Sequence, residues 1–291
     1  MAYKTPSSAE SEPEELEAWL DSYDDADAAT PAPDEVRRVR WSEHVGFLED
    51  YWAAGQHCSI FAASDGGKTH LIVNLLPLWQ RYPVLFFKAK PKDATLGRLG
   101  HTVKEFPGSG ARLKYEIRRR TAPNSPAWVR DPEWYVLQLP TYKWSGRRQN
   151  PELERARRLA GQAMDRAYRE GTWVLVFDEV KVLAGREDPH LNLPAPMTIV
   201  WEQGRSQPVT VIAGTQSPSL APPPMYDQAR HIYMGRITDE YRQDRLGEIG
   251  GASKRIRAIL PTLRAREFLY VFTGRERGER DQMYVIQAPP P

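Results

Sequence analysis

The sequence predicts an α/β fold in which helices flank a mainly parallel β-sheet. One observation behind this prediction is a segment at 57–62 with the pattern of a buried strand, followed by a helical pattern at 68–82 and an apolar run at 84–87. This strand–helix–strand order is a βαβ unit, whose two strands pair in parallel. The second observation is the unbroken apolar run at 173–177. Strands of parallel sheets are buried on both faces and have such continuous runs, whereas half-exposed strands alternate.

The remaining elements follow from hydrophobic spacing and from breaker residues. The helix predicted at 42–52 has apolar residues at helical intervals, Leu48 and Trp52 among them. Pro77 lies inside the helix predicted at 68–82, where its ring and missing N–H should kink or end the helix. Further helices are predicted at 151–170, 197–204 and 239–249, and further strands at 114–118, 134–139, 209–214, 231–234, 268–272 and 283–286.

Charge divides the 291-residue chain into two parts. Residues 1–35 contain eleven Asp or Glu and one Lys, a net charge of −10, whereas the other 256 residues contain 39 basic and 27 acidic groups, a net charge of +12. We therefore predict an acidic disordered tail at 1–35 and one folded domain at 36–291, with an insertion around 107–150. A basic body suits a polyanionic partner such as nucleic acid, and the alternative is an ordinary solvated surface.

Composition excludes several classes of protein. The mean hydropathy is −0.60, and no window approaches the roughly eighteen uninterrupted apolar residues of a membrane span, so we expect no transmembrane segment. The N-terminal residues lack the basic-then-apolar pattern of a signal peptide, so we do not expect secretion. Cys58 is the only cysteine, which excludes an intrachain disulfide framework and a multi-cysteine zinc site.

A glycine-rich segment between the first predicted strand and its helix fits the Walker A pattern, with Ala62 at the position of the first glycine. Its residues are Ser64, Asp65, Gly66, Gly67, Lys68 and Thr69. Glycines let the backbone curl so that successive N–H groups point at phosphate oxygens, and the helix N-terminus adds partial positive charge. Lys68 would reach the β- and γ-phosphates of ATP, and the Thr69 hydroxyl would ligate Mg²⁺. The alternative is a strand–helix turn that holds no ligand.

Two further strands end in polar residues that complete this chemistry. Asp178 and Glu179 follow the apolar run at 173–177, and in a parallel sheet that strand end lies beside the phosphate loop. Asp178 would hold the Mg²⁺ shell, while Glu179 would polarise the attacking water. Gln216, after the strand at 209–214, is placed to sense the γ-phosphate or to orient the water. The alternative for Asp178-Glu179 is a charge pair that faces solvent. The alternative for Gln216 is an amide that caps the next loop.

Together, these motifs resemble the FtsK–HerA superfamily of DNA-pumping ATPases. The resemblance covers about residues 60–235 and rests on the Walker A segment, on Asp178-Glu179, and on the strand that ends in Thr215-Gln216. It implies a RecA-like or FtsK–HerA-like P-loop NTPase fold, with a P-loop ATPase domain that uses ATP and Mg²⁺. It also implies a homo-oligomeric ring, a hexamer, that threads double-stranded DNA through a central channel.

The chain looks most like a viral genome-packaging ATPase within this superfamily, because it has no membrane segment and no large extra domain. Such a protein would be found in the host cytoplasm or with the virion, docked on a capsid or membrane protein at a portal vertex. A ring ATPase sends an arginine into its neighbour's site, and Arg205 and Arg236 are the candidates because each borders a core strand. Basic segments at 118–120 and 143–148 would contact DNA phosphates without reading sequence.

Two other functions stay open from the sequence. The same ATPase could serve plasmid or integrative-element DNA transfer, docked on a membrane coupling protein. A protein of another class, a nucleotide-dependent switch, would bind nucleotide and never translocate. DNA-stimulated ATP turnover distinguishes the motor from the switch.

Overall fold

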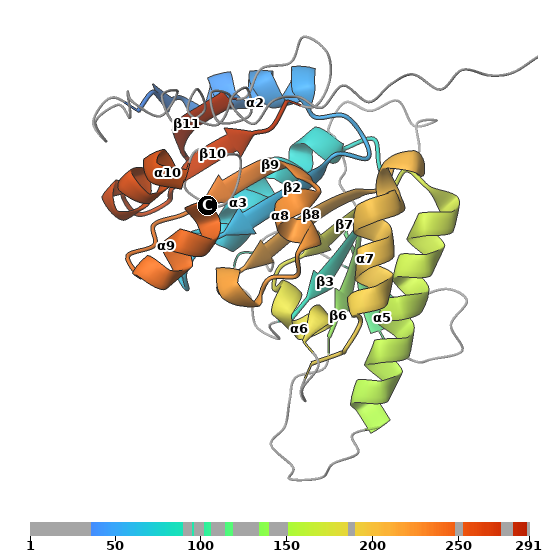
Figure 1. Ribbon diagram of the computed structural model, residues 1–291. Helices are drawn as coiled ribbons and strands as arrows, with labels where there is room; N and C mark the ends of the chain where they lie inside the picture. Colours follow the sequence, from blue (N-terminus) through green and yellow to red (C-terminus); the bar gives the residue numbers. More distant parts are fainter. Residues whose placement is uncertain are drawn as a thin grey trace, which may run out of the picture.

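An eleven-stranded β-sheet forms the centre of the described part of the protein (Figure 1). It is seen in a computed structural model that describes residues 36–89, 95, 102–105, 114–118, 134–139, 151–185, 190–247, 253–274 and 282–289. The strands lie in the order β1-β11-β10-β9-β2-β8-β7-β3-β6-β5-β4. Their bounds are β1 Arg38–Val39, β2 His57–Phe61, β3 Val84–Lys88, β4 Thr102–Glu105, β5 Lys114–Arg118, β6 Trp134–Gln138, β7 Val174–Phe177, β8 Thr210–Thr215, β9 Ala229–Met234, β10 Glu267–Phe272 and β11 Gln282–Gln287.

The neighbouring strands from β9 to β6, in the middle of the sheet, run parallel. The predicted α/β fold with a mainly parallel sheet is therefore confirmed. Antiparallel pairs flank this core: β10 with β9 and β11 on one side, and β5 with β6 and β4 on the other. The strand predicted at 134–139 is β6, which continues the parallel core beside β3. The rest of the predicted insertion, apart from β5, and the predicted tail at 1–35 lie outside the described residues.

Helices cover both faces of the sheet, and the residues of β7 alternate between the two faces. Their bounds are α2 Trp41–Tyr51, α3 Lys68–Leu75, α5 Pro151–Glu170, α6 Val180–Ala184, α7 Pro194–Gln203, α8 Pro224–Asp227, α9 Glu240–Gly247 and α10 Ser253–Ile259. Val174 and Val176 pack in the apolar cluster that includes α2 and α3, whereas Leu175 and Phe177 pack in the cluster that includes α5 and α7. Burial on both faces explains the continuous apolar run of β7.

Proline ends α3 early, as predicted. The helix stops at Leu75, and the chain continues as a 3₁₀ turn, Leu76–Trp79, that contains Pro77. The structure also contains short elements that were not predicted, namely β1, β4, α6, α8 and α10. None of the described helices is long and apolar enough to cross a membrane.

A buried histidine fastens α2 to the sheet. His44 Nδ1 lies 2.9 Å from the Tyr284 hydroxyl, and its Nε2 lies 2.8 Å from the Tyr233 hydroxyl. Burial lowers the pKa of His44 to about 3, so the ring is neutral at physiological pH. A neutral imidazole has one donor and one acceptor nitrogen, and the two hydroxyls satisfy both. These two contacts hold α2 against β9 and β11.

Candidate active site

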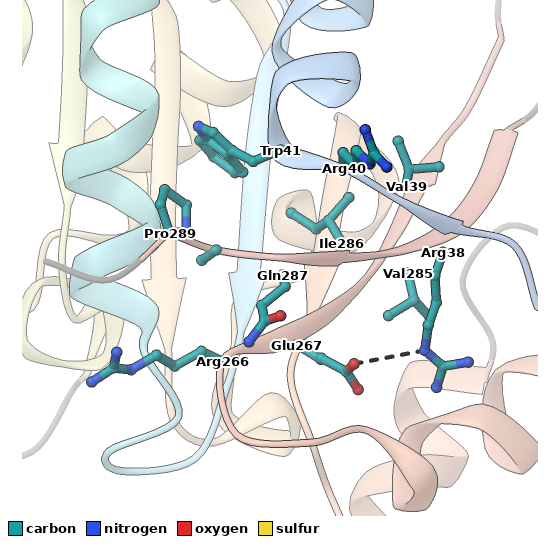
Figure 2. Close-up of a pocket in the computed structure, with 11 residues that line it drawn as sticks. Arg38, Val39, Arg40, Trp41, Arg266, Glu267, Val285, Ile286, Gln287 and Pro289 are labelled. Atoms are coloured by element: carbon teal, nitrogen blue, oxygen red, sulfur yellow. Dashed lines mark ion pairs between the residues drawn. The ribbon is translucent and has the colours of Figure 1, made fainter.

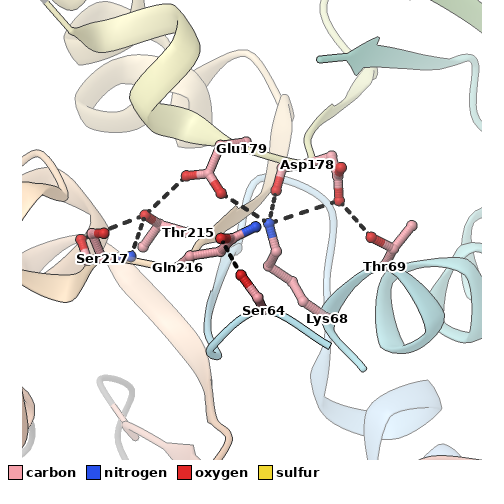
Figure 3. A network of polar contacts seen from close by, with 8 residues as sticks. All are labelled: Ser64, Lys68, Thr69, Asp178, Glu179, Thr215, Gln216 and Ser217. Carbon is pink, nitrogen blue, oxygen red and sulfur yellow. Dashed lines mark hydrogen bonds and ion pairs between the residues drawn. The ribbon is translucent and has the colours of Figure 1, made fainter. Parts of the chain in front are cut away.

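The carboxyl ends of β2, β8 and β7 meet at one edge of the sheet, and the predicted site residues follow these ends. The Walker A segment follows β2, Asp178-Glu179 follows β7, and Thr215-Gln216 ends β8. Because the three strands are adjacent and parallel, the three segments come together there, and Figure 3 shows the resulting network.

Two residues in left-handed conformations shape the loop between β2 and α3. Asp65 has φ 61°, and Gly67, at the start of α3, has φ 88°. A side chain on Gly67 would be strained, which explains a glycine before Lys68. Asp65 is exposed and carries the same type of strain, and such strain is typical of functional loops.

Ala62 replaces the first glycine of the Walker A pattern without strain, since its φ is not positive. Its methyl group is buried. A Cβ on Gly66 would lie 3.2 Å from that methyl, and a Cβ on Gly235 would lie 3.0 Å from it. These two glycines therefore make room for the alanine.

The Lys68 ammonium lies between two carboxylates. Its Nζ is 3.9 Å from Asp178 Oδ1 and 3.3 Å from Glu179 Oε2, and it also donates to the Asp178 carbonyl. The side chains of Lys68, Asp178 and Glu179 are only 5%, 1% and 15% exposed. Burial of three charges in so little water is costly unless they compensate each other, so the cluster depends on the lysine.

Gly214 provides the space for the Lys68 side chain. A Cβ at this position of β8 would lie 2.6 Å from Lys68 Cδ and 3.0 Å from the Asp178 carbonyl oxygen. Any larger residue would push the lysine out of its place between the carboxylates. This role of Gly214 depends on the register of β8 beside β2, which no motif in the sequence indicates.

The end of β8 contacts both the loop and the carboxylates. Thr215 Oγ1 donates to Glu179 Oε1 at 3.1 Å, and Ser64 Oγ donates to Gln216 Oε1 at 2.8 Å. Gln216 therefore touches the phosphate loop, while Thr215 holds the second carboxylate oxygen of Glu179. These contacts fix the orientation of Glu179 beside Lys68.

Thr69 and Asp178 offer the donor set that Mg²⁺ prefers. Thr69 Oγ1 donates to Asp178 Oδ1 at 2.9 Å, so a hydroxyl and a carboxylate oxygen are adjacent at the N-terminus of α3. Mg²⁺ takes one or two protein oxygens and completes its octahedron with phosphate oxygens and water. No group of three or more His, Cys, Asp or Glu that could hold a metal occurs among the described residues.

The two candidate arginines lie at opposite edges of the sheet, and both are exposed. Arg236 follows β9, and the preceding Gly235 N donates to Phe61 O at 2.7 Å, so Arg236 is near the start of the phosphate loop. Arg205 precedes β8, and a Cβ on Gly55 would lie 3.1 Å from its Cα. β8, which has six residues and is roughly 20 Å long, therefore separates Arg205 from the site.

A third arginine, Arg266, lies beside the phosphate loop and was not predicted. A Cβ on Gly67 would lie 3.3 Å from Arg266 Cγ. Arg266 is exposed and directly precedes β10. Its neighbours in sequence carry no motif, and its position follows only from the pairing of β10 with β9 and of β9 with β2.

Comparison with known proteins identifies the fold. B204, the DNA-packaging ATPase from Sulfolobus Turreted Icosahedral Virus, aligns at 15% identity with a TM-score of 0.50, over 80% of this chain and 98% of B204. B204 from Sulfolobus turreted icosahedral virus 2, in complex with ATPγS, aligns at 13% identity with a TM-score of 0.49, over 79% and 97% of the two chains. The pCW3 conjugation coupling protein TcpA aligns at 12% identity with a TM-score of 0.45, over 83% of this chain and 61% of TcpA.

No protein family model and no curated protein sequence matches the chain. At 15% identity, the likeness to the first B204 structure concerns the fold alone. The chain has the α/β fold of that B204 structure, with a mainly parallel sheet flanked by helices. The loop between β2 and α3, which the Walker A pattern predicts to bind phosphate, lies where Lys68, Asp178 and Glu179 meet.

Proposed function

We propose that this protein is an ATP-dependent double-stranded DNA translocase that packages a viral genome. The proposed ATPase activity is supported by the position of Lys68 between Asp178 and Glu179, where parallel strands end. The choice of DNA packaging is supported by the fold likeness to a DNA-packaging ATPase and by the basic charge of residues 36–291.

The phosphate loop, Ser64 to Thr69, would bind ATP through its backbone N–H groups and through Lys68. A phosphate oxygen that accepts a hydrogen bond from Lys68 Nζ would compete with Glu179 for the same ammonium group. Binding of ATP would therefore weaken the Lys68–Glu179 contact and leave the carboxylate available to a water molecule. Thr215 would keep Glu179 in place during this exchange.

Thr69 and Asp178 would hold Mg²⁺, because their adjacent oxygens fit its preference. The bound ion would neutralise charge on the β- and γ-phosphates. Glu179 would act as the general base for the attacking water. Gln216 would sense the γ-phosphate or orient that water, and its contact with Ser64 on the phosphate loop supports this role.

A hexameric ring would complete the site with an arginine from the neighbouring subunit. Arg205 is the stronger candidate, because it is exposed at the edge of the sheet opposite its own phosphate loop. A residue so placed serves a neighbour's site more readily than its own. Arg236 is the second candidate. Double-stranded DNA would pass through the ring, and a capsid or membrane protein at a portal vertex would be the docking partner.

Hydrolysis of ATP with and without duplex DNA tests this proposal. We expect Mg²⁺-dependent turnover that rises with DNA and is lost in Lys68→Ala and Glu179→Gln. The matched controls are Lys181→Ala on α6 and the exposed Glu202→Gln on α7, which should retain turnover. Nucleotide binding with turnover that ignores DNA would contradict the translocase and favour the switch protein.

A further inference from the structure

A pocket of about 590 Å³ lies where the N-terminal strand meets the C-terminal one (Figure 2). Three segments line it: residues 38–41 from β1 and the start of α2, residues 266–267 at the start of β10, and residues 285–289 at the end of β11. Its volume is within the range of about 300–1,000 Å³ that small-molecule sites occupy. None of the residues discussed above for phosphate or Mg²⁺ binding lines it.

Strand pairing places this pocket at the same edge of the sheet as the phosphate loop. β10 runs antiparallel to β9, so its first residues lie near the carboxyl end of β9 and hence of β2. Gln287, at the end of β11, pairs with Glu267, at the start of β10. The chain after β11 then reaches the helix of the phosphate loop, because Asn74 Nδ2 donates to Pro289 O at 3.4 Å.

Arg266 joins the pocket to the phosphate loop. It lines the pocket, and its Cγ lies 3.3 Å from where a Cβ on Gly67 would be. Figure 2 shows its side chain extending from the pocket toward α3. The residue has φ 64°, a left-handed conformation that is costly for arginine, and Ala288 N donates to its carbonyl at 3.1 Å. The backbone is therefore held in a strained form that keeps the guanidinium at the boundary between pocket and loop.

The side chains of the pocket suit a planar aromatic ligand with polar edges. Trp41 is partly exposed and offers an indole face, and Gln287 is exposed and offers an amide donor and acceptor. On the side away from Arg266, Arg38 pairs with the buried Glu267 at 3.6 Å. Aromatic, amide and guanidinium groups around one cavity form a typical environment for a nucleobase and its sugar.

We propose that this pocket holds the base and ribose of the nucleotide whose phosphates bind at Lys68. Trp41 contacts the base, Gln287 bonds to its polar edge, and Arg266 contacts the nucleotide where the nucleoside joins the phosphates. The inference rests on the proposed function, because it requires that the loop bind nucleotide phosphates. It adds that nucleoside affinity comes from the two ends of the described chain, β1–α2 and β11, rather than from the strands that carry the catalytic groups.

Calorimetric titrations with ADP and with pyrophosphate, each with Mg²⁺, distinguish the nucleoside pocket from the phosphate loop. Both ligands carry phosphates, and only ADP carries a base and ribose. Wild type should bind ADP more tightly than pyrophosphate. Loss of base stacking is worth about 1–3 kcal/mol, so Trp41→Ala should weaken ADP binding about 5- to 150-fold and leave pyrophosphate binding unchanged. Trp41→Phe should restore most of the ADP affinity. Gln287→Ala, at an exposed position, provides a second variant that does not disturb packing.

Arg266→Gly removes the guanidinium and suits the left-handed backbone, so the variant should keep the fold. It should weaken the binding of ADP more than the binding of pyrophosphate. Tyr51→Ala, an exposed position at the far end of α2, is the control and should change neither affinity. An unchanged ADP-to-pyrophosphate ratio in Trp41→Ala, Gln287→Ala and Arg266→Gly would overturn the pocket while the proposed function stands. Absence of both ADP and pyrophosphate binding in wild type would overturn the proposed function and the pocket together.

Discussion

Replacement of Lys68 by methionine should destabilise the folded protein as well as abolish catalysis. The substitution keeps the apolar stem and removes the one ammonium group that lies between Asp178, 1% exposed, and Glu179, 15% exposed. Removal of one partner from a buried ion pair costs about 3–5 kcal/mol, because the remaining charge is left uncompensated. Thr69 and Thr215 still donate to the two carboxylates, so we expect a loss near the lower end, about 3 kcal/mol.

Thermal unfolding followed by circular dichroism measures this loss. At about 2–4 °C per kcal/mol for a domain of this size, the Tm of Lys68→Met should fall by roughly 6–12 °C. The matched control is Lys181→Met, on α6, which should change the Tm by less than about 2 °C.

A double-mutant cycle with Asp178→Asn tests the cause of the loss. If the uncompensated carboxylate is the cause, the double variant should be more stable than the sum of the single effects predicts, by at least about 1 kcal/mol. Equal Tm values for Lys68→Met and Lys181→Met, or additive effects in the cycle, would refute the account of a charge cluster that depends on Lys68.

Three further predictions concern other parts of the structure. Gly214→Ala should displace Lys68, since its Cβ would lie 2.6 Å from Lys68 Cδ. The variant should lose about 1–3 kcal/mol of stability in denaturant unfolding and should bind ATP more weakly. The control is Gly46→Ala on α2, whose Cβ would have nothing within 4 Å and which should be neutral or stabilising. Asp65→Gly should raise stability by up to about 1 kcal/mol in the same assay, because glycine tolerates φ 61°. Burial lowers the pKa of His44 from 6.5 to about 3, so between these two pH values only the unfolded chain gains this proton. The contribution of His44 to stability should be complete above pH 6.5 and should fall by up to about 1.4 kcal/mol per pH unit between pH 6.5 and about 3. His44→Gln should flatten that slope in acid titrations of stability.

The parallel core of the fold could be predicted because its signals are local. The continuous apolar runs in β3 and β7 reflect burial on both faces, and Pro77 ends α3 through its own missing N–H. The shortest elements gave no such signal. The two-residue β1 has no periodicity of its own, and it is a strand only because residues 285–286 lie beside it.

The candidate site was predictable to the extent that its residues follow strand ends. Lys68, Asp178 and Glu179 meet because parallel strands place their carboxyl ends together, which a motif and a strand order suffice to indicate. Gly214 and Arg266 could not be found in this way. The role of Gly214 depends on strand register, and the position of Arg266 beside Gly67 depends on the pairing of three strands that are distant in sequence.

Displacement of a third strand from a DNA triplex tests the central claim most directly. A translocase that runs along duplex DNA strips the third strand, whereas an ATPase that only binds DNA leaves it in place. We predict displacement that requires ATP and Mg²⁺, increases with time, and disappears in Lys68→Ala and Glu179→Gln but not in Lys181→Ala. A protein that hydrolyses ATP with duplex DNA present and never displaces the third strand would contradict the account.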